Sequence, residues 1–175
     1  RVYYSSIQQI REIVASGVFG KLNAIDIKEG GITGKTKKGK EHYQTKSEIS
    51  GGGILMESGC HTLSQLAHIL NDHTFLVRQS EVEYINNFDS DILARIKATK
   101  GKDVIQIAYD LSLIRPIRTE SVYYFDNAIL SFNHLNAGAQ VTVSRQKEKK
   151  VVAILDHEKK WATTFYQAFY LKWKL

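Results

Sequence analysis

The spacing of apolar residues predicts a helix near the start of the chain. From Ile7 to Val14 they recur every three to four positions, which places them on one face of a helix. Ser6 is placed to cap this helix while Gln9 returns the hydrogen bond, and Gly17 is placed to end it. We therefore expect one helix between this cap and the glycine.

A strand and a second helix are expected next. Residues 21–27 are mostly apolar and predict the strand, and a polar, Gly- and Lys-rich loop follows over 30–50. Residues 54–70 predict the helix, because their apolar side chains fall on one side at about 100° per residue. That side consists of Leu55, Gly59, Leu63, Leu66, Ala67 and Leu70. The loop is the longest in the chain, and long loops in compact domains are often functional.

From Thr74 onward the apolar period changes to two, which predicts a meander of about six strands. The alternation is clear over 92–98 and 105–111, with a hairpin connection at 100–103 between them. Shorter strands are expected at 122–125, 128–132, 139–144 and 151–155. Short connections imply that neighbouring strands pair antiparallel. A last helix, over about 158–173, is expected to close the domain.

This order of elements predicts an α+β fold with a single open sheet, mixed but predominantly antiparallel, and helices packed on one face. The whole chain, 1–175, is expected to be one domain. An apolar sheet face that the helices leave open would not stay monomeric in water, so we expect a homodimer through the sheet. The residues expected to mark that face are Tyr123, Phe125, Ile129 and Phe132.

Composition and charge exclude several classes of protein. The net charge is +6, but the basic residues lie in separate clusters such as 35–40 and 147–150, so we expect no nucleic-acid binding. No apolar stretch approaches the roughly 20 residues that span a bilayer, so we expect no membrane association. Cys60 is the only cysteine and no signal peptide is visible. These features favour a reducing, cytoplasmic setting.

Two kinds of ligand site find no support in the sequence. The stretch 30–36 resembles a phosphate loop, but that motif needs its first Gly at position 29, where this chain has Glu29. No Gly-x-Gly-x-x-Gly turn is present, so no cofactor-binding residue is expected in this chain. The six His residues and one Cys lack the spacing of metal ligands, so no metal site is expected.

The most informative stretch is the run of three glycines at 51–53, directly before the second helix. Glycines here allow the backbone to approach a ligand closely. One polar stripe of the helix consists of Glu57, His61, Ser64 and His68. A carboxylate four residues from an imidazole can hydrogen-bond it or raise its pKa. The stripe is either a solvated surface or a set of residues suited to proton and hydroxyl chemistry.

The run 51–61, Gly-Gly-Gly-x-Leu-x-Glu-x-Gly-x-His, resembles the Gly-Gly-Gly-x-Leu-x-Asp-x-Gly-x-His motif of the Gfo/Idh/MocA family of oxidoreductases, named after glucose-fructose oxidoreductase, inositol dehydrogenase and MocA. The Ser-Gly-x-x-Gly turn at 16–20 looks like the segment that opens the family's C-terminal domain. The aromatic stretch 161–173 is similar to its closing helix. The resemblance implies a C-terminal domain with a fold like that of dihydrodipicolinate reductase and glyceraldehyde-3-phosphate dehydrogenase.

The resemblance also implies the residues of a site. His61 takes the position of the catalytic His that acts on the substrate hydroxyl, and Glu57 that of the carboxylate that helps to bind or orient it. Expected substrate contacts are Gly52, Gly53, Ser64, Tyr43 and Lys46, together with His42. Glu57 replaces the commoner Asp, and Ser64 stands where many members have another Asp.

The family binds NAD or NADP in an N-terminal Rossmann domain, which this chain lacks, together with its Glu-Lys-Pro motif. The resemblance therefore implies one domain of an oxidoreductase that acts on a hydroxyl of a sugar, polyol or sugar nucleotide, and that is not active as this chain alone. One alternative is a non-catalytic ligand-binding or dimerising domain of the same fold. Another is a binder of acidic partners or nucleic acid, driven by net charge.

Overall fold

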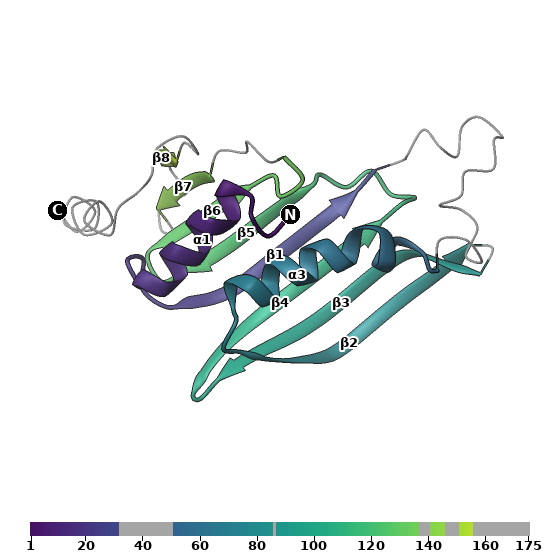
Figure 1. Ribbon diagram of the computed structural model, residues 1–175, viewed down its shortest axis with the longest axis horizontal. Helices are drawn as coiled ribbons and strands as arrows, with labels where there is room; N and C mark the ends of the chain where they lie inside the picture. Colours follow the sequence, from purple (N-terminus) through teal and green to yellow (C-terminus); the bar gives the residue numbers. More distant parts are fainter. Residues whose placement is uncertain (32–50, 86, 137–140, 146–150, 156–175) are drawn as a thin grey trace.

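The structure is a computed structural model that describes residues 1–31, 51–85, 87–136, 141–145 and, for the backbone alone, 151–155. In these residues an eight-stranded mixed sheet carries the helices α1 and α3 on one face, as the sequence predicted (Figure 1). The elements are α1 (Ser5–Ser16), β1 (Leu22–Gly30), the π-helical turn η2 (Leu55–Gly59), α3 (Cys60–Ile69), β2 (Thr74–Ile85), β3 (Phe88–Lys100), β4 (Asp103–Ser112), β5 (Glu120–Phe125), β6 (Ala128–Phe132), β7 (Val141–Arg145) and β8 (Val151–Leu155).

Strand β1 lies inside the sheet, whose order is β2-β3-β4-β1-β5-β6-β7-β8. It pairs in parallel with β4, where Ile25 lies opposite Ile107, and antiparallel with β5. A parallel neighbour requires a crossover, and the chain supplies one through α3 before β2, β3 and β4 are added. The remaining described pairs are antiparallel, as their short connections predict. The hairpin between β3 and β4 turns at Gly101, which has a φ of 59°.

The first helix forms as predicted, but it has a different cap. α1 begins at Ser5 with Tyr4 as its N-cap residue, and no side chain caps it. Ser6 lies within the first turn and is fully buried, one turn before Ile10 on the core face. The prediction of Ser6 as the cap is therefore wrong, because packing of this face against the sheet determines where the helix begins. Gly17 ends the helix with a φ of 63°, as predicted.

The second predicted helix forms as η2 and α3, but its buried face is rotated from the prediction. Leu66 and Leu70 are buried as expected, whereas Leu55 and Leu63 are 40% and 37% exposed. The residues that α3 buries are Thr62, Gln65, Leu66 and Ile69. The reason is the π-helical turn over 55–59, which holds an extra residue and shifts the phase of every residue after it.

The helix-covered face of the sheet holds the aromatic core. Tyr123, Phe125 and Phe132 are 2%, 1% and 3% exposed, and their side chains lie in the same buried cluster as Ile10 of α1. The prediction that these three residues mark the open face is therefore wrong. Only Ile129 of that set lies on the opposite face, opposite Tyr124. A shift of one residue in a strand exchanges the two faces, and the prediction had combined residues from both.

The open face carries both polar and apolar side chains. Its central residues are Asp26, Lys28, Arg95, Ala108, Val122, Tyr124 and Ile129, which are in register across β3, β4, β1, β5 and β6. Tyr124 donates a hydrogen bond to the carboxylate of Asp26 at 3.1 Å. The predicted closing helix lies outside the residues that the structure describes.

Candidate functional site

The glycine run before η2 is held against strand β3 by Asp89. The backbone N–H groups of Gly53 and Leu55 each donate a hydrogen bond of 2.8 Å to the carboxylate of Asp89. A Cβ on Gly53 would lie 1.9 Å from the carbonyl oxygen of Asp89, so only glycine fits at this position. The prediction was that the glycines let the backbone approach a ligand closely. In the structure the backbone of Gly53 approaches the backbone of β3 closely. Asp89 is 36 residues away in sequence, and no local pattern identifies it as a cap.

His61 is half-buried in the first turn of α3. Burial, and after it the positive charge of the Arg1 guanidinium, lower the pKa of His61 below its usual value of 6.5. The carboxylate of Glu29 acts in the opposite direction and raises it. The imidazole is therefore mainly neutral at pH 7, which is the form that accepts a proton.

A buried network of polar side chains holds Glu29. His134 Nε2 lies 3.1 Å from Glu29 Oε2, and Ser121 Oγ lies 2.8 Å from His134 Nδ1. The three residues are 5%, 0% and 2% exposed, and Arg1 Nη1 lies 4.0 Å from Glu29 Oε1. Burial alone would raise the pKa of Glu29, but hydrogen bonds from His134 and Ser58 outweigh this effect and lower it. The buried carboxylate is therefore ionised at neutral pH.

This network was not predicted, although strand periodicity contained a signal for it. Glu29 follows Ile25 and Ile27 at a spacing of two, so it continues the buried side of β1. On β5, Ser121 lies two positions before the buried Tyr123, so it also belongs to the buried side of its strand. A carboxylate on a core-facing strand position requires a partner, and here the partner is His134. Only the sheet order, which places β5 beside β1, brings these residues together.

Tyr109 of β4 fixes the start of α3 on the sheet. Its hydroxyl is hydrogen-bonded to Thr62 Oγ1 and donates a second hydrogen bond of 3.1 Å to the carbonyl oxygen of Gly59. Burial raises the pKa of Tyr109, so the phenol is neutral and available as a donor. Gly59 permits this approach, because a Cβ there would lie 3.0 Å from Leu111 Cδ1. The residue next to Thr62 is His61, whose backbone position is therefore determined by this contact.

The other predicted site residues do not gather around His61 as one group. Ser64 is exposed and its hydroxyl donates to the carbonyl oxygen of Cys60 at 2.6 Å. His68 faces α1, where its Nε2 lies 3.0 Å from Gln8 Nε2 and 3.4 Å from Arg11 Nη1. Glu57 is half-buried in η2, and Gly52 lies beside it in the glycine run. The loop residues His42, Tyr43 and Lys46 lie outside the described residues.

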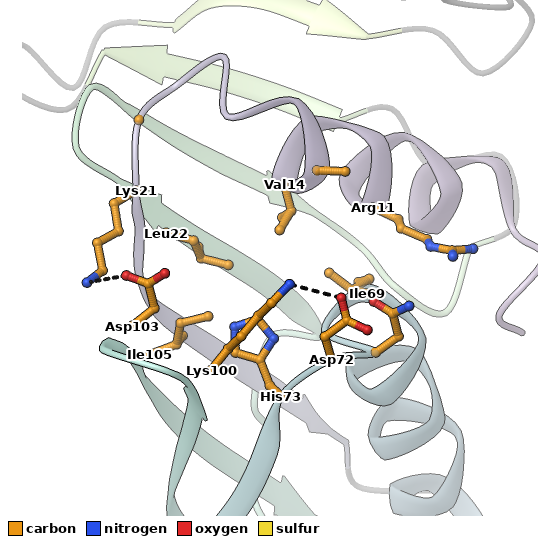
Figure 2. Close-up of a pocket in the computed structure, with 13 residues that line it drawn as sticks. Arg11, Val14, Lys21, Leu22, Ile69, Asp72, His73, Lys100, Asp103 and Ile105 are labelled. Atoms are coloured by element: carbon orange, nitrogen blue, oxygen red, sulfur yellow. Dashed lines mark hydrogen bonds and ion pairs between the residues drawn. The ribbon is translucent and has the colours of Figure 1, made fainter.

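A cavity of about 670 Å³ lies at the opposite end of α1 and α3 from His61 (Figure 2). Two ion pairs cross its rim, with 3.0 Å from Lys21 Nζ to Asp103 Oδ1 and 2.9 Å from Lys100 Nζ to Asp72 Oδ2. Its apolar wall consists of Val14, Leu22, Ile69 and Ile105. None of the site residues predicted from the sequence lines this cavity. The candidate site therefore centres on His61, a titratable side chain in the first turn of α3.

Two further searches covered the described part of the chain, one for metal-ligand clusters and one for membrane-spanning helices. No three His, Cys, Asp or Glu residues within it are arranged to hold a metal ion. None of the helices in these ranges is long and apolar enough to cross a membrane.

Similar folds occur in solved oxidoreductases. The chain is 12% identical to an inositol dehydrogenase homolog from Azotobacter vinelandii in complex with NAD+, with a TM-score of 0.74 over 94% of this chain and 44% of that one. An aldose-aldose oxidoreductase from Caulobacter crescentus in complex with glycerol is 11% identical, with a TM-score of 0.72 over 95% and 48%. A levoglucosan dehydrogenase in complex with NADH and L-sorbose is 9% identical, with a TM-score of 0.69 over 89% and 44%.

The chain thus spans less than half the length of these three structures, whose low identity to it establishes the fold alone. No sequence among the curated proteins matches it. Residues 7–97 match the family model described as the GFO/IDH/MocA C-terminal domain. That match covers just over half of the chain and includes the glycine run, Glu57 and His61. The chain therefore belongs to the Gfo/Idh/MocA family, as a C-terminal domain of this group of oxidoreductases.

Proposed function

We propose that this chain is the substrate-binding and dimerisation domain of an NAD(P)-dependent oxidoreductase that acts on a hydroxyl of a sugar, polyol or sugar nucleotide. The observation that carries the proposal is the position of His61. Its half-buried imidazole stands at the start of α3, within the electrostatic reach of a buried carboxylate. Structures of similar fold with NAD+ or with NADH and L-sorbose support an NAD-type cofactor and a polyol-like substrate.

A nicotinamide bound by the full-length protein would supply the hydride acceptor for the carbon that bears the hydroxyl group. His61 accepts the proton that leaves that hydroxyl, and it returns a proton in the reverse direction. Its lowered pKa keeps the imidazole in the accepting form at neutral pH. We propose that a Rossmann domain in the full-length protein holds the cofactor, because residues 1–175 contain no Gly-x-Gly-x-x-Gly sequence.

The other predicted residues are proposed to bind substrate. Glu57 in η2 and Ser64 in α3 lie on either side of His61 in the sequence, and their oxygens can form hydrogen bonds with substrate hydroxyls. Tyr43 and Lys46 belong to the loop that leads into the glycine run. The glycines at 52–53 contribute by placing η2 against β3, which brings the first turn of the helix to the site.

Dimerisation is proposed to use the open face of the sheet. Among the residues that the structure describes, the helices α1 and α3 cover one face, and the other face exposes apolar atoms of Val122, Tyr124 and Ile129 between charged side chains. A second copy on this face would bury those atoms. This replaces the surface expected from Tyr123 and Phe125, which lie in the core.

The proposal is tested by turnover of the full-length protein with NAD+ or NADP+ and a panel of sugars and polyols. His61→Ala is expected to lower kcat by about 10² to 10⁴, the usual contribution of a positioned proton-transfer residue. The Kd of the nicotinamide is expected to stay unchanged. His68→Ala is the matched control, because that imidazole contacts α1, and its kcat is expected to stay within about threefold of wild type. Equal turnover in wild type and His61→Ala would exclude the catalytic role.

The cavity in Figure 2 favours a second candidate function, that of a non-catalytic ligand-binding domain. Its rim charges and apolar wall suit a small molecule with both polar and apolar parts. Crystals of the chain soaked with the same sugars and polyols distinguish the two functions. Density in this cavity, together with a full-length protein that turns over none of them, would favour the second function.

A further inference from the structure

Strand β2 is a long, exposed edge of the sheet. It runs from Thr74 to Ile85, all 12 of its residues are exposed, and it contains no proline. Among the described strands it stands first in the sheet order, so β3 is its one neighbour there. A strand in this position presents a row of unpaired backbone N–H and C=O groups, which is a template for another strand. Most strands have about five or six residues, so this edge offers about twice the usual length for pairing.

The apolar side chains of β2 lie mainly on the helix-covered side of the sheet. Phe75, Val77 and Val82 pair in register with residues of β3 that belong to the buried core. Cross-strand partners share a face, so these three side chains point to the same side as the core, and Ser80 and Tyr84 continue the row. We call these five residues the edge row. Its four large members are 38%, 58%, 38% and 67% exposed in chain order.

The helices α1 and α3 leave the edge row open. α3 packs on β4, where Thr62 is hydrogen-bonded to Tyr109, and β2 lies two strands further out (Figure 1). The edge row is therefore exposed above the sheet as well as along its free side. A contiguous row of exposed apolar side chains marks an interaction surface.

A β-bulge brings the edge row onto one face. The pairing of β2 with β3 shifts by one residue between Val77 and Gln79, which leaves Arg78 as an extra residue. An extra residue reverses the alternation of the side chains beyond it. Val77 and Val82 are five positions apart and would point to opposite faces of a regular strand. The bulge puts them on the same face, and it also determines which residues can meet across a two-fold axis.

The edge row is complementary to a second copy of itself. In an antiparallel pair related by a two-fold axis, one residue lies opposite its own copy. With Ser80 at the axis and the bulged residues left out of the pairing, Val77 lies opposite Val82 of the second copy. Phe75 then lies opposite Tyr84 of the second copy. Each apolar member of the row thus meets another apolar member, and the two strands overlap along their whole length.

The charged residues of β2 favour the same alignment. Arg78 lies beside Glu81 of the second copy, and Glu83 lies opposite an apolar residue, so no two like charges are opposed. An axis at Glu81 would oppose two carboxylates. An axis at Gln79 would leave the last two residues of the strand unpaired. The alignment centred on Ser80 has neither defect.

We propose that a second copy of this chain adds its own β2 to this edge, antiparallel and centred on Ser80, so that two sheets become one. A second copy is the partner because the edge row matches its own sequence in both apolar and charged positions. This interface differs from the open face proposed above and does not depend on the role of His61. Its two-fold axis is perpendicular to the sheet, whereas that of a face-to-face contact lies in the sheet plane, so the two contacts together close a tetramer.

Disulfide trapping tests the centre of the alignment. Ser80→Cys is made in a Cys60→Ser background, because Cys60 is the one natural cysteine. Opposed residues of antiparallel strands have Cα atoms about 4.5 to 5.5 Å apart, which suits a disulfide. We expect oxidation to give a covalent dimer of twice 19.9 kDa. Val82→Cys in the same background is the matched control and is expected not to cross-link, because its two copies lie roughly 13 Å apart along the strand. Equal trapping of both variants, or of neither, would overturn the inference.

Charge substitutions test the same alignment without a disulfide. Val77→Lys and Val82→Glu each place a charge in the edge row, and sedimentation equilibrium at micromolar concentration is expected to give half the wild-type mass. The double variant is expected to recover the wild-type mass, because each Lys then faces a Glu of the second copy. This recovery would exclude misfolding as the reason for the loss. Leu63→Lys, at an apolar residue of α3 that is 37% exposed, is the control and is expected to keep the wild-type mass.

Two sedimentation results would overturn the inference. A wild-type chain that sediments as a monomer has no such interface. Wild-type mass in both single variants would leave the open face of the sheet as the site of association. Turnover of the full-length protein tests His61 separately, so the failure of either conclusion leaves the other standing.

Discussion

Gly53→Ala is the substitution whose effect the structure defines most directly. The new Cβ would lie 1.9 Å from the carbonyl oxygen of Asp89 and 2.6 Å from its backbone nitrogen, so backbone on one side has to move. Overpacking of this kind typically costs about 1 to 3 kcal/mol. The movement also weakens the two hydrogen bonds from Gly53 and Leu55 to the Asp89 carboxylate, whose loss at a helix start costs about 1 kcal/mol or more.

We therefore expect Gly53→Ala to lower the free energy of unfolding by about 2 to 4 kcal/mol. The measurement is urea denaturation of the chain, followed by circular dichroism. Gly31→Ala is the matched control, because a Cβ there meets nothing within 4 Å, and its change is expected to stay within about 0.5 kcal/mol. Equal stability of the two variants would refute the packing of Gly53 against Asp89 and would leave close approach to a ligand as the reason for the glycine.

Two further predictions concern the polar groups beneath α3. Tyr109→Phe is expected to cost about 1 to 2 kcal/mol of unfolding free energy, because Thr62 and the carbonyl of Gly59 lose a buried partner. Tyr124→Phe, on the open face, is expected to lose less than half as much unfolding free energy as Tyr109→Phe. Equal losses for the two variants in urea denaturation would contradict the prediction. In the folded chain the pKa of Glu29 lies below its usual value of 4.5. The ionised Glu29 therefore contributes fully to the free energy of unfolding above pH 4.5, and this contribution is lost as the pH falls through the folded pKa. In Glu29→Gln the urea midpoint is therefore expected to fall less steeply than in wild type between about pH 5 and pH 3. The same slope of urea midpoint against pH in both proteins would contradict this prediction.

The sequence determined the nature and order of most elements, because periodicity records which face of each segment is buried. The period of two over 92–98 and 105–111 became β3 and β4, and Gly17 ended α1. The glycine run and His61 also carried the family resemblance, since these residues are contiguous along the chain.

Tertiary structure alone decided which faces and which partners these residues have. The π-helical turn over 55–59 rotated α3, so an ideal helical period assigned Leu63 to the wrong side. Tyr123 and Phe125 belong to the core because β5 lies beside β1, under α1. Glu29 lies in one network with His134 and Ser121 because β1 pairs with β5 in the assembled sheet. Such contacts depend on the register between distant strands, which is a property of the assembled sheet and not of any local stretch of residues.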